Sequence, residues 1–199
     1  MRKRRRKESE GSCSHTATKM KQDLQETVAI PEKIQVVANG KVTVKGPKGE
    51  VSRVLKDPKI SIHVKDNSVV ISSKKATKRE RKKVYTFIAH IKNMFKGVTE
   101  GHYYELKICA AHFPINVTVS GKDLVIKNFL GENAPRVLHL EEGVSLKVNG
   151  DVIRIESLDV ELAGRTASQI ELITRVRNRD RRIFQDGIFI INKCGEVMQ

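Results

Sequence analysis

An internal repeat constrains the fold of this chain more than any other feature of its sequence. When residues 30–71 are aligned with residues 113–155, an offset of about 83 residues, the turns and the alternating apolar positions recur in the same order. Gly40-Lys41 falls opposite Gly121-Lys122, and both pairs are flanked by residues that alternate between apolar and polar types. This agreement of turns and period-two patterns predicts two tandem copies of one small domain.

Each copy combines several short strands with one helical segment. Apolar residues recur at helical spacing near 76–95 in the first copy and near 160–177 in the second. The first set is Val84, Phe87, Ile88, Ile91 and Phe95, and the second is Ala163, Ala167, Ile170 and Thr174. One helix on one face of an antiparallel sheet buries both apolar surfaces. We therefore expect an α+β fold of two tandem copies of a small domain, each an antiparallel-rich sheet packed on one helix.

The repeat also divides the chain. We expect the first α+β repeat over residues 27–109 and the second over residues 110–190, with a C-terminal tail at 191–199. Residues 1–26 belong to neither copy, and most of them are basic, Ser, Thr or Gly residues without apolar periodicity. We expect these residues to form a basic, disordered extension.

The positive charge is concentrated in the first half of the chain. The 199 residues contain 38 Lys and Arg against 23 Asp and Glu, a formal net charge of +15. Residues 1–110 hold 26 bases and 11 acids, which is +15, whereas residues 111–199 hold 12 of each, which is zero. A polyanion would therefore meet a broad positive surface in the first half and only local clusters in the second.

Composition and motifs argue against several classes of protein. No apolar run approaches the roughly 18 residues that a membrane helix needs, and the basic first residues lead into no secretory signal. The 3 Cys are too few for a disulfide framework and indicate a reducing compartment. Trp is absent and aromatic residues are 5 % of the chain, which argues against a large aromatic ligand pocket. We therefore expect no membrane partner, no small-molecule substrate and no cofactor.

The candidate catalytic and metal motifs are incomplete. Gly46-Pro47-Lys48-Gly49 lacks the Walker spacing, and strand patterns flank it on both sides, which favours a hairpin turn over the clamp of a KH module. In that turn, Lys45 and Lys48 could touch phosphate. Cys109 with His112, and Cys13 with His15, each supply half of a zinc site at most, since zinc takes four ligands. Because no nucleophile elbow occurs either, we expect neither a metal site nor an enzyme.

Two basic clusters carry the strongest functional signal. The cluster at residues 74–83 comprises Lys74, Lys75, Lys78, Arg79, Arg81, Lys82 and Lys83. Bases at the start of a helix oppose its dipole, so an external polyanion explains them better than helix stability does. The second cluster lies at the predicted end of the second helix and comprises Arg175, Arg177, Arg179, Arg181 and Arg182. Arginine favours bidentate contact with phosphate, and the alternative for the second cluster is a solvated helix end with one internal Arg–Asp pair.

Several collinear motifs resemble one known family. They are Val-Thr-Val-Lys-Gly-Pro-Lys-Gly at residues 42–49, Ala-His-Phe-Pro-Ile-Asn at 111–116, Asn-Phe-Leu-Gly-Glu at 128–132 and the stretch 178–189. Together with the tandem repeat, these motifs resemble the universal large-subunit ribosomal protein family called L six in bacteria and L nine in eukaryotes, in its eukaryotic and archaeal branch. Eukaryotic members usually begin at a Met-Lys that matches Met20-Lys21, so residues 1–19 resemble an added extension.

The resemblance implies a structural, non-enzymatic protein of the large (60S) ribosomal subunit. It implies binding to large-subunit rRNA near the base of the factor-binding region, with other large-subunit proteins as neighbours. It also implies that the main rRNA contact lies in the second domain. Carried over to this sequence, that contact comprises Asn178, Arg179, Arg181, Arg182, Phe184, Asp186 and Gly187.

We expect the protein in cytoplasmic ribosomes after nuclear and nucleolar passage during assembly. The six consecutive bases from Arg2 to Lys7 could serve as an import signal or as an arm that threads through rRNA, and the alternative is a passive tail. Two other functions stay open at this stage: a free RNA-binding or ribosome-assembly protein, and an enzyme with an unrecognised site.

Overall fold

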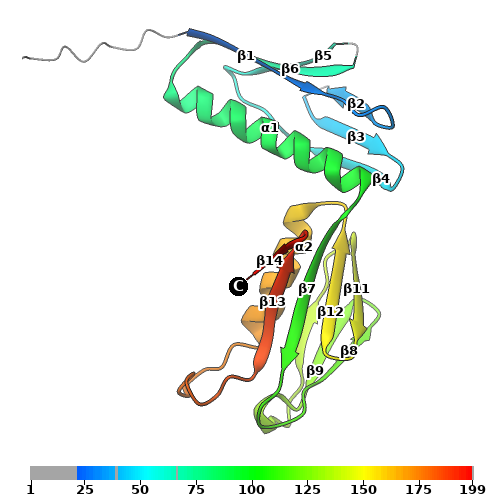
Figure 1. The fold of residues 1–199 in the computed structure, drawn as a ribbon, viewed down its shortest axis with the longest axis vertical. Coiled ribbons are helices and arrows are strands. Elements are labelled where there is room, and N and C mark those ends of the chain that lie inside the picture. The colour runs from blue at the N-terminus through cyan, green and yellow to red at the C-terminus, as the bar shows by residue number, and fades with distance from the viewer. Residues whose placement is uncertain (1–21, 39, 66, 199) are drawn as a thin grey trace, which may run out of the picture.

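The computed structural model describes residues 22–38, 40–65 and 67–198 of the chain. These residues form two α+β units in succession, each with one long helix packed against antiparallel strands (Figure 1). The prediction of two tandem α+β copies is therefore confirmed. Residues 1–21 of the expected disordered extension, which include Cys13, His15 and the bases from Arg2 to Lys7, lie outside the described residues.

The first repeat contains two three-stranded sheets and the helix α1. One sheet has the order β1-β6-β5 and the other has the order β2-β3-β4. The elements are β1 (Gln22–Ala29), β2 (Gln35–Ala38), β3 (Val42–Gly46), β4 (Gly49–Arg53), β5 (Ser61–Lys65), β6 (Ser68–Ala76) and α1 (Lys78–Thr99). Val44, Ile71, Val84 and Ile91 are fully buried between these strands and α1, so the period-two and helical patterns define one core.

The second repeat contains a three-stranded sheet, a five-stranded sheet and the helix α2. The sheets have the orders β10-β9-β8 and β11-β12-β7-β13-β14. The elements are β7 (His102–Cys109), β8 (Asn116–Ser120), β9 (Asp123–Lys127), β10 (Arg136–His139), β11 (Val144–Asn149), β12 (Val152–Ser157), α2 (Val160–Ile173), β13 (Gly187–Lys193) and β14 (Glu196–Val197). Leu106, Ile155, Ile170 and Ile188 are fully buried in the core between the five-stranded sheet and α2.

Strand pairing places the boundary between the repeats earlier than the sequence-based division does. The division at residues 109 and 110 assigns β7 to the first repeat, but β7 pairs with β12 on one side and β13 on the other. The order β11-β12-β7 also matches the order β5-β6-β1, so β7 is the counterpart of β1. We therefore propose that the repeats divide at Gly101.

At both ends of the chain, residues that were expected to lie outside the repeats belong to strands. Residues 22–26, which were expected to belong to the disordered extension, are the first part of β1 and pair with β6. Residues 191–193 and 196–197, which were expected to lie in a tail, belong to β13 and β14. Both segments are ordered because their backbone N–H and C=O groups form hydrogen bonds with a neighbouring strand.

The two repeats are packed closely at the end of α1. A Cβ atom added at Gly97 would overlap the backbone oxygen of Leu158, so only glycine allows this approach. The guanidinium of Arg53 forms an ion pair of 2.7 Å with Glu161 at the start of α2. The ring of His102 donates from Nε2 to the carbonyl of Asn93 at 3.0 Å, which ties β7 to α1. In the part of the chain that the structure describes, neither helix is long and apolar enough to cross a membrane.

Candidate nucleic-acid interface

The segment 174–186 joins α2 to β13, and its first residues end the helix. Arg136 donates from Nη1 to the carbonyl of Ile173, the last residue of α2. The buried hydroxyl of Thr174 donates to the carbonyl of Ile170 at 3.1 Å and accepts from the backbone N–H of Ile188 at 3.1 Å. The helix predicted to reach residue 177 therefore ends four residues earlier, because these tertiary contacts bind its last turn to β10 and β13.

Asp186 fixes the other end of this segment. Its carboxylate accepts from the backbone N–H groups of Ala111 (2.5 Å) and His112 (3.0 Å) and from Nδ1 of His112 (2.5 Å). Burial alone would raise the pKa of Asp186, but the hydrogen bonds from His112 and Ala111 outweigh it and hold the pKa below its ordinary value. Asp186 is therefore an ionised clip between the end of β7 and the start of β13.

Between these two fixed ends, Asp180 shapes the backbone. Its carboxylate accepts from the N–H of Arg182 at 2.9 Å, and its carbonyl accepts from the N–H groups of Ile183 and Phe184. Among the described residues, no arginine lies within 4.0 Å of the Asp180 carboxylate, so the structure does not show the alternative of an internal Arg–Asp pair. Aspartate at the start of a turn commonly binds backbone groups in this way.

An aromatic and cationic stack covers the outer side of the segment. The guanidinium carbon of Arg179 lies 4.8 Å from the ring centre of Phe184. The ring of Phe184 in turn stacks on His112 with the ring centres 4.9 Å apart. Because Asp186 holds His112, the stack connects Arg179 to a buried anchor, and this contact limits the rotamers that Arg179 samples.

The arginines of the segment are exposed and have no acidic partner among the residues that the structure describes. Elsewhere in the structure, Arg53, Arg136, Arg154 and Arg165 each form an ion pair with a glutamate. By contrast, among residues 22–38, 40–65 and 67–198, no carboxylate lies within 4.0 Å of the guanidinium groups in the segment. We call these five side chains the arginine cluster: Arg175, Arg177, Arg179, Arg181 and Arg182.

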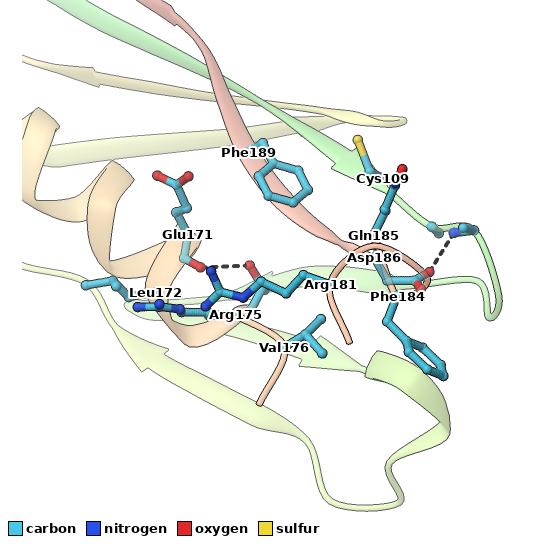
Figure 2. A pocket seen from close by; sticks show the side chains of 13 residues that line it. Cys109, Glu171, Leu172, Arg175, Val176, Arg181, Phe184, Gln185, Asp186 and Phe189 are labelled. Carbon is cyan, nitrogen blue, oxygen red and sulfur yellow. Dashed lines mark hydrogen bonds between the residues drawn. The ribbon is translucent and has the colours of Figure 1, made fainter. Parts of the chain in front are cut away.

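A hollow of about 850 Å³ opens beside the arginine cluster, between the end of α2, the end of β7 and the start of β13. Its apolar lining includes Leu172, Val176 and Phe189, and its charged lining comprises Arg175, Arg181, Glu171 and the buried Asp186. Figure 2 shows the ring of Phe189 on β13 and the two arginine side chains extending across the hollow. The site therefore combines an apolar wall with two arginines that have no carboxylate within 4.0 Å among the described residues, and Glu171 of α2 lines it as well.

The residues that the resemblance assigned to the site divide into two groups in the structure. Arg179, Arg181 and Arg182, together with Asn178, are exposed. Asp186 and Gly187 are buried, so they shape the segment and do not form its outer surface. Phe184 is half-buried within the stack.

The basic cluster at residues 74–83 in the first repeat differs from the arginine cluster, because one of its bases forms an ion pair within the chain. Lys83 forms an ion pair with Asp57, and Lys59 contacts Glu80 at 3.0 Å. Glu80 also accepts from the backbone N–H of Thr77 at 3.0 Å and from its hydroxyl. The Thr77 hydroxyl and then Lys59 lower the pKa of Glu80 to about 2. Two carboxylates and two lysines therefore stabilise the start of α1.

The other bases of this cluster are exposed on β6 and the first turns of α1. None has an ion-pair partner among the described residues, and Lys75 donates its backbone N–H to Asp23 at 2.7 Å. They are Lys74, Lys75, Lys78, Arg79, Arg81 and Lys82. Figure 1 places the start of α1 and the α2–β13 segment at opposite ends of the molecule. The fold therefore does not bring the two basic clusters together.

The hairpin turn predicted at residues 46–49 is present between β3 and β4, but its lysines are engaged within the chain. Lys45 forms an ion pair of 3.1 Å with Glu50. Lys48 donates from Nζ to the carbonyl of Glu100, at the end of α1. This position is remote from the cluster at 74–83, because a helix of 22 residues is about 33 Å long.

Sequence reasoning missed several residues that build the site. Arg136 was the most detectable, because it falls opposite Arg53 in the repeat alignment, and each arginine contacts α2. His112 was considered as half of a zinc site, whereas it donates to Asp186 and stacks on Phe184. No local pattern indicated that Phe189 lines a hollow, because the hollow forms only when β13 pairs with β7.

Comparison with known proteins gives consistent matches. The family model described as ribosomal protein L6 matches residues 30–101 and 113–187, one match in each repeat. The protein "Large ribosomal subunit protein uL6" of Methanococcus vannielii is 43% identical over 176 residues, which cover 88% of this chain and 97% of that protein. The protein of the same name from Aeropyrum pernix is 45% identical over 170 residues, which cover 84% of this chain and 93% of that protein. Two repeats, each matched by the family model, and relatives aligned over nearly their whole length show that this chain belongs to the ribosomal protein L6 family.

Proposed function

We propose that the protein is a structural constituent of the large ribosomal subunit that binds large-subunit rRNA through the arginine cluster. The relatives from Methanococcus vannielii and Aeropyrum pernix are named as large-subunit proteins, which supports the first part. The second part depends on one observation: five exposed arginines that have no acidic partner in the described part of the chain, on a segment fixed at both ends by Thr174 and Asp186.

The chemistry of these side chains suits the phosphate backbone of RNA. A guanidinium group presents two parallel N–H donors to two phosphate oxygens, which adds geometric selectivity to the attraction between charges. Folded RNA is recognised largely through its shape and its backbone, so a rigid arrangement of arginines can select one RNA structure. In this proposal, Asn178 and the arginine cluster contact RNA, whereas Phe184, Asp186 and Gly187 position them.

The cluster at 74–83 is a second RNA surface in this proposal. Its exposed bases lie at the far end of α1 from the joint between the repeats, so they would contact a different rRNA segment. Lys45 and Lys48, which were expected to touch phosphate, contribute less because both amines already have partners within the chain.

The proposal includes the cellular setting that the sequence resemblance implies. The subunit would be the 60S subunit, with the site near the base of the factor-binding region and with other large-subunit proteins as neighbours. The protein would reach cytoplasmic ribosomes after nuclear and nucleolar passage. The resemblance of residues 111–116 and 178–189 to the eukaryotic and archaeal branch supports this setting.

Two measurements test the proposal. The endogenous protein should sediment with large subunits and whole ribosomes on a sucrose gradient, also after a high-salt wash. In filter-binding titrations, the full chain should bind large-subunit rRNA more tightly than an unrelated RNA of equal length. Its log K should fall with log salt by roughly 0.7–0.9 per phosphate contact. Protein found only in low-mass fractions while ribosomes stay intact would favour a free RNA-binding or assembly protein.

A further inference from the structure

A second hollow adjoins the first one on the side of the arginine cluster. It has a volume of about 570 Å³, and its charged lining is made by Arg175, Arg177, Arg179 and Arg181. Arg175 and Arg181 line both hollows, and so do Leu172 and Val176. The two hollows are therefore neighbouring parts of one depression, one mainly apolar and the other cationic.

The apolar part has an exposed aromatic ring at a defined position. Phe189 is 43% exposed, and its ring lies across the backbone of Gly187, two residues earlier on the same face of β13. A Cβ atom added at Gly187 would lie only 3.0 Å from the ring of Phe189. Glycine at this position thus lets the ring lie flat along the strand. Leu172, which is 56% exposed, lines the same hollow from α2.

The cationic part has no counter-charge of its own. Its four arginines belong to the arginine cluster, which has no carboxylate within 4.0 Å among the residues that the structure describes. An occupant of the whole depression must therefore combine a flat apolar face with a negative charge close beside it. A nucleotide whose base has left the stack has this combination, because its base and its phosphate are joined through one sugar.

We propose that this depression binds one unstacked nucleotide of RNA, with the base against Phe189 and Leu172 and the phosphate among Arg175, Arg177, Arg179 and Arg181. This inference rests on the proposed function, which requires only that the arginine cluster binds rRNA. It adds that the protein selects an RNA structure in which a base is already extruded. A bulge or a loop supplies such a base without the loss of a base pair.

The nucleotide accounts for the depression better than other anions do. A free phosphate would leave the exposed ring of Phe189 and the side chain of Leu172 without a partner. A base that stacks on an aromatic ring removes both apolar faces from water, and such stacking contributes about 1–3 kcal/mol per base by alanine substitution. At about 1.4 kcal/mol for each factor of ten, the middle of this range corresponds to a factor of about 10–30 in affinity.

The test uses the large-subunit rRNA fragment that the full chain protects from nuclease digestion. The fragment is synthesised with each unpaired nucleotide replaced in turn by an abasic nucleotide, which keeps the phosphate and removes the base. We expect one abasic position to weaken binding about tenfold. The variant Phe189→Ala should bind the intact fragment about tenfold more weakly, and that abasic position should cause no further loss in this variant.

Ile183→Ala provides a matched control. Ile183 is a large apolar residue of the neighbouring segment 174–186, is 64% exposed, and lines neither hollow. We expect this variant to keep both the affinity for the intact fragment and the sensitivity to the abasic position. Circular dichroism and the melting temperature establish that Phe189→Ala folds, and Phe189→Leu, which keeps an apolar side chain, should retain part of the affinity.

The outcomes separate the inference from the proposed function. If no abasic position lowers the affinity, or if Phe189→Ala keeps the sensitivity to it, the inference is wrong while binding by the arginine cluster stands. If the full chain protects no large-subunit rRNA fragment, the proposed function itself fails. If ultraviolet crosslinking within intact subunits joins residues 187–190 to a protein and not to RNA, a neighbouring protein occupies the depression and the inference is overturned.

Discussion

In the first repeat, Lys59 and Lys83 contact carboxylates of their own chain, whereas in the second repeat the arginine cluster has no such partner among the described residues. The first arrangement strengthens the beginning of α1, where Glu80 and Thr77 also meet. The second arrangement leaves charge on a fixed segment. A basic run in a sequence can therefore serve stability or binding, and the acidic groups within reach decide which.

The second repeat has an exposed segment with arginines that are unpaired among the described residues, because the chain continues differently after α2 than after α1. After α1, the chain passes through Gly101 directly into β7, which belongs to the next repeat. After α2, the chain crosses residues 174–186 and returns as β13 to the free edge of β7. In the first repeat, β1 has β6 as its only strand partner among the described residues. The added strand thus creates the segment that presents the arginine cluster.

The largest expected effect compares two triple variants in RNA binding. Arg179, Arg181 and Arg182 are replaced by Gln in one, and Arg79, Arg81 and Lys82 in the other. We expect the second-repeat variant to bind the protected rRNA fragment about a thousandfold more weakly, since each lost charge-assisted hydrogen bond contributes about 1.5 kcal/mol or more. Filter binding at several salt concentrations measures both the affinity and the salt slope.

The two triple variants should also differ in selectivity. The second-repeat variant should approach the affinity for unrelated RNA, because its arginines fix the geometry of the contact. In the first-repeat variant, the slope of log K against log salt should decrease by a similar amount, roughly 0.7–0.9 for each lost phosphate contact. This variant should nevertheless keep its preference for the fragment. A greater loss of affinity and selectivity in the first-repeat variant would show that total charge outweighs geometry.

The second prediction concerns the clip that holds the arginine cluster in place. We expect Asp186→Ala to lower the free energy of unfolding by about 2–4 kcal/mol, because it leaves two backbone N–H groups without their acceptor. Asp180→Ala, which removes one exposed hydrogen bond to Arg182, should lower it by about 1 kcal/mol. Urea unfolding measures both, and equal losses would show that the clip contributes little.

The third prediction uses acid to weaken the internal contacts of the first repeat. The pKa of Glu80 is lowered from 4.5 to about 2, so its contribution to stability is complete above pH 4.5 and is lost as the pH falls toward 2. Glu80→Gln should therefore be less stable than the parent chain above pH 4.5, and the difference should shrink at lower pH. Thermal melts across this range follow the change, and a difference that stays constant would exclude a role for the charge of Glu80.

The smallest expected effect compares two neighbouring lysines. Lys83→Gln removes the ion pair with Asp57, and we expect the melting temperature to fall by about 2–4 °C. Lys82→Gln removes an exposed charge without an ion-pair partner among the described residues, and the melting temperature should change by less than about 1 °C. Equal shifts in melting temperature would show that the ion pair of Lys83 contributes no more to stability than the exposed charge of Lys82.

Much of the fold could be predicted from local patterns. The repeat, the turns and the buried faces of both helices follow from alternation and from helical spacing, and Val84, Ile91, Ala163 and Ile170 are fully buried as expected. Comparison with relatives confirms the family resemblance and the prediction of a non-enzymatic protein. The choice of rRNA-contacting residues stays a prediction.

The errors arose where distant segments meet. The boundary that we propose at Gly101 lies earlier than the sequence-based one, because the aligned part of the repeats begins after β1 and β7, whose sequences share too little to align. The end of α2 was missed because Arg136 and Ile188, far from it in sequence, determine it. A phosphate contact of Lys48 stays a prediction, but the partner of Lys48 within the chain, the carbonyl of Glu100, is a backbone group that no sequence pattern identifies.

The pairing of β7 with β13 also determines the order in which the protein can be completed during synthesis. Cys109 pairs with Gly187, so 78 residues must be added before the second edge of β7 finds its strand. At about 5–20 residues per second, this interval lasts about 4–16 s, while β12 can already cover the first edge. The arginine cluster acquires its fixed geometry only when β13 arrives. In the proposed function, a nascent chain would therefore present this surface to RNA in its final geometry only after β13 has paired with β7.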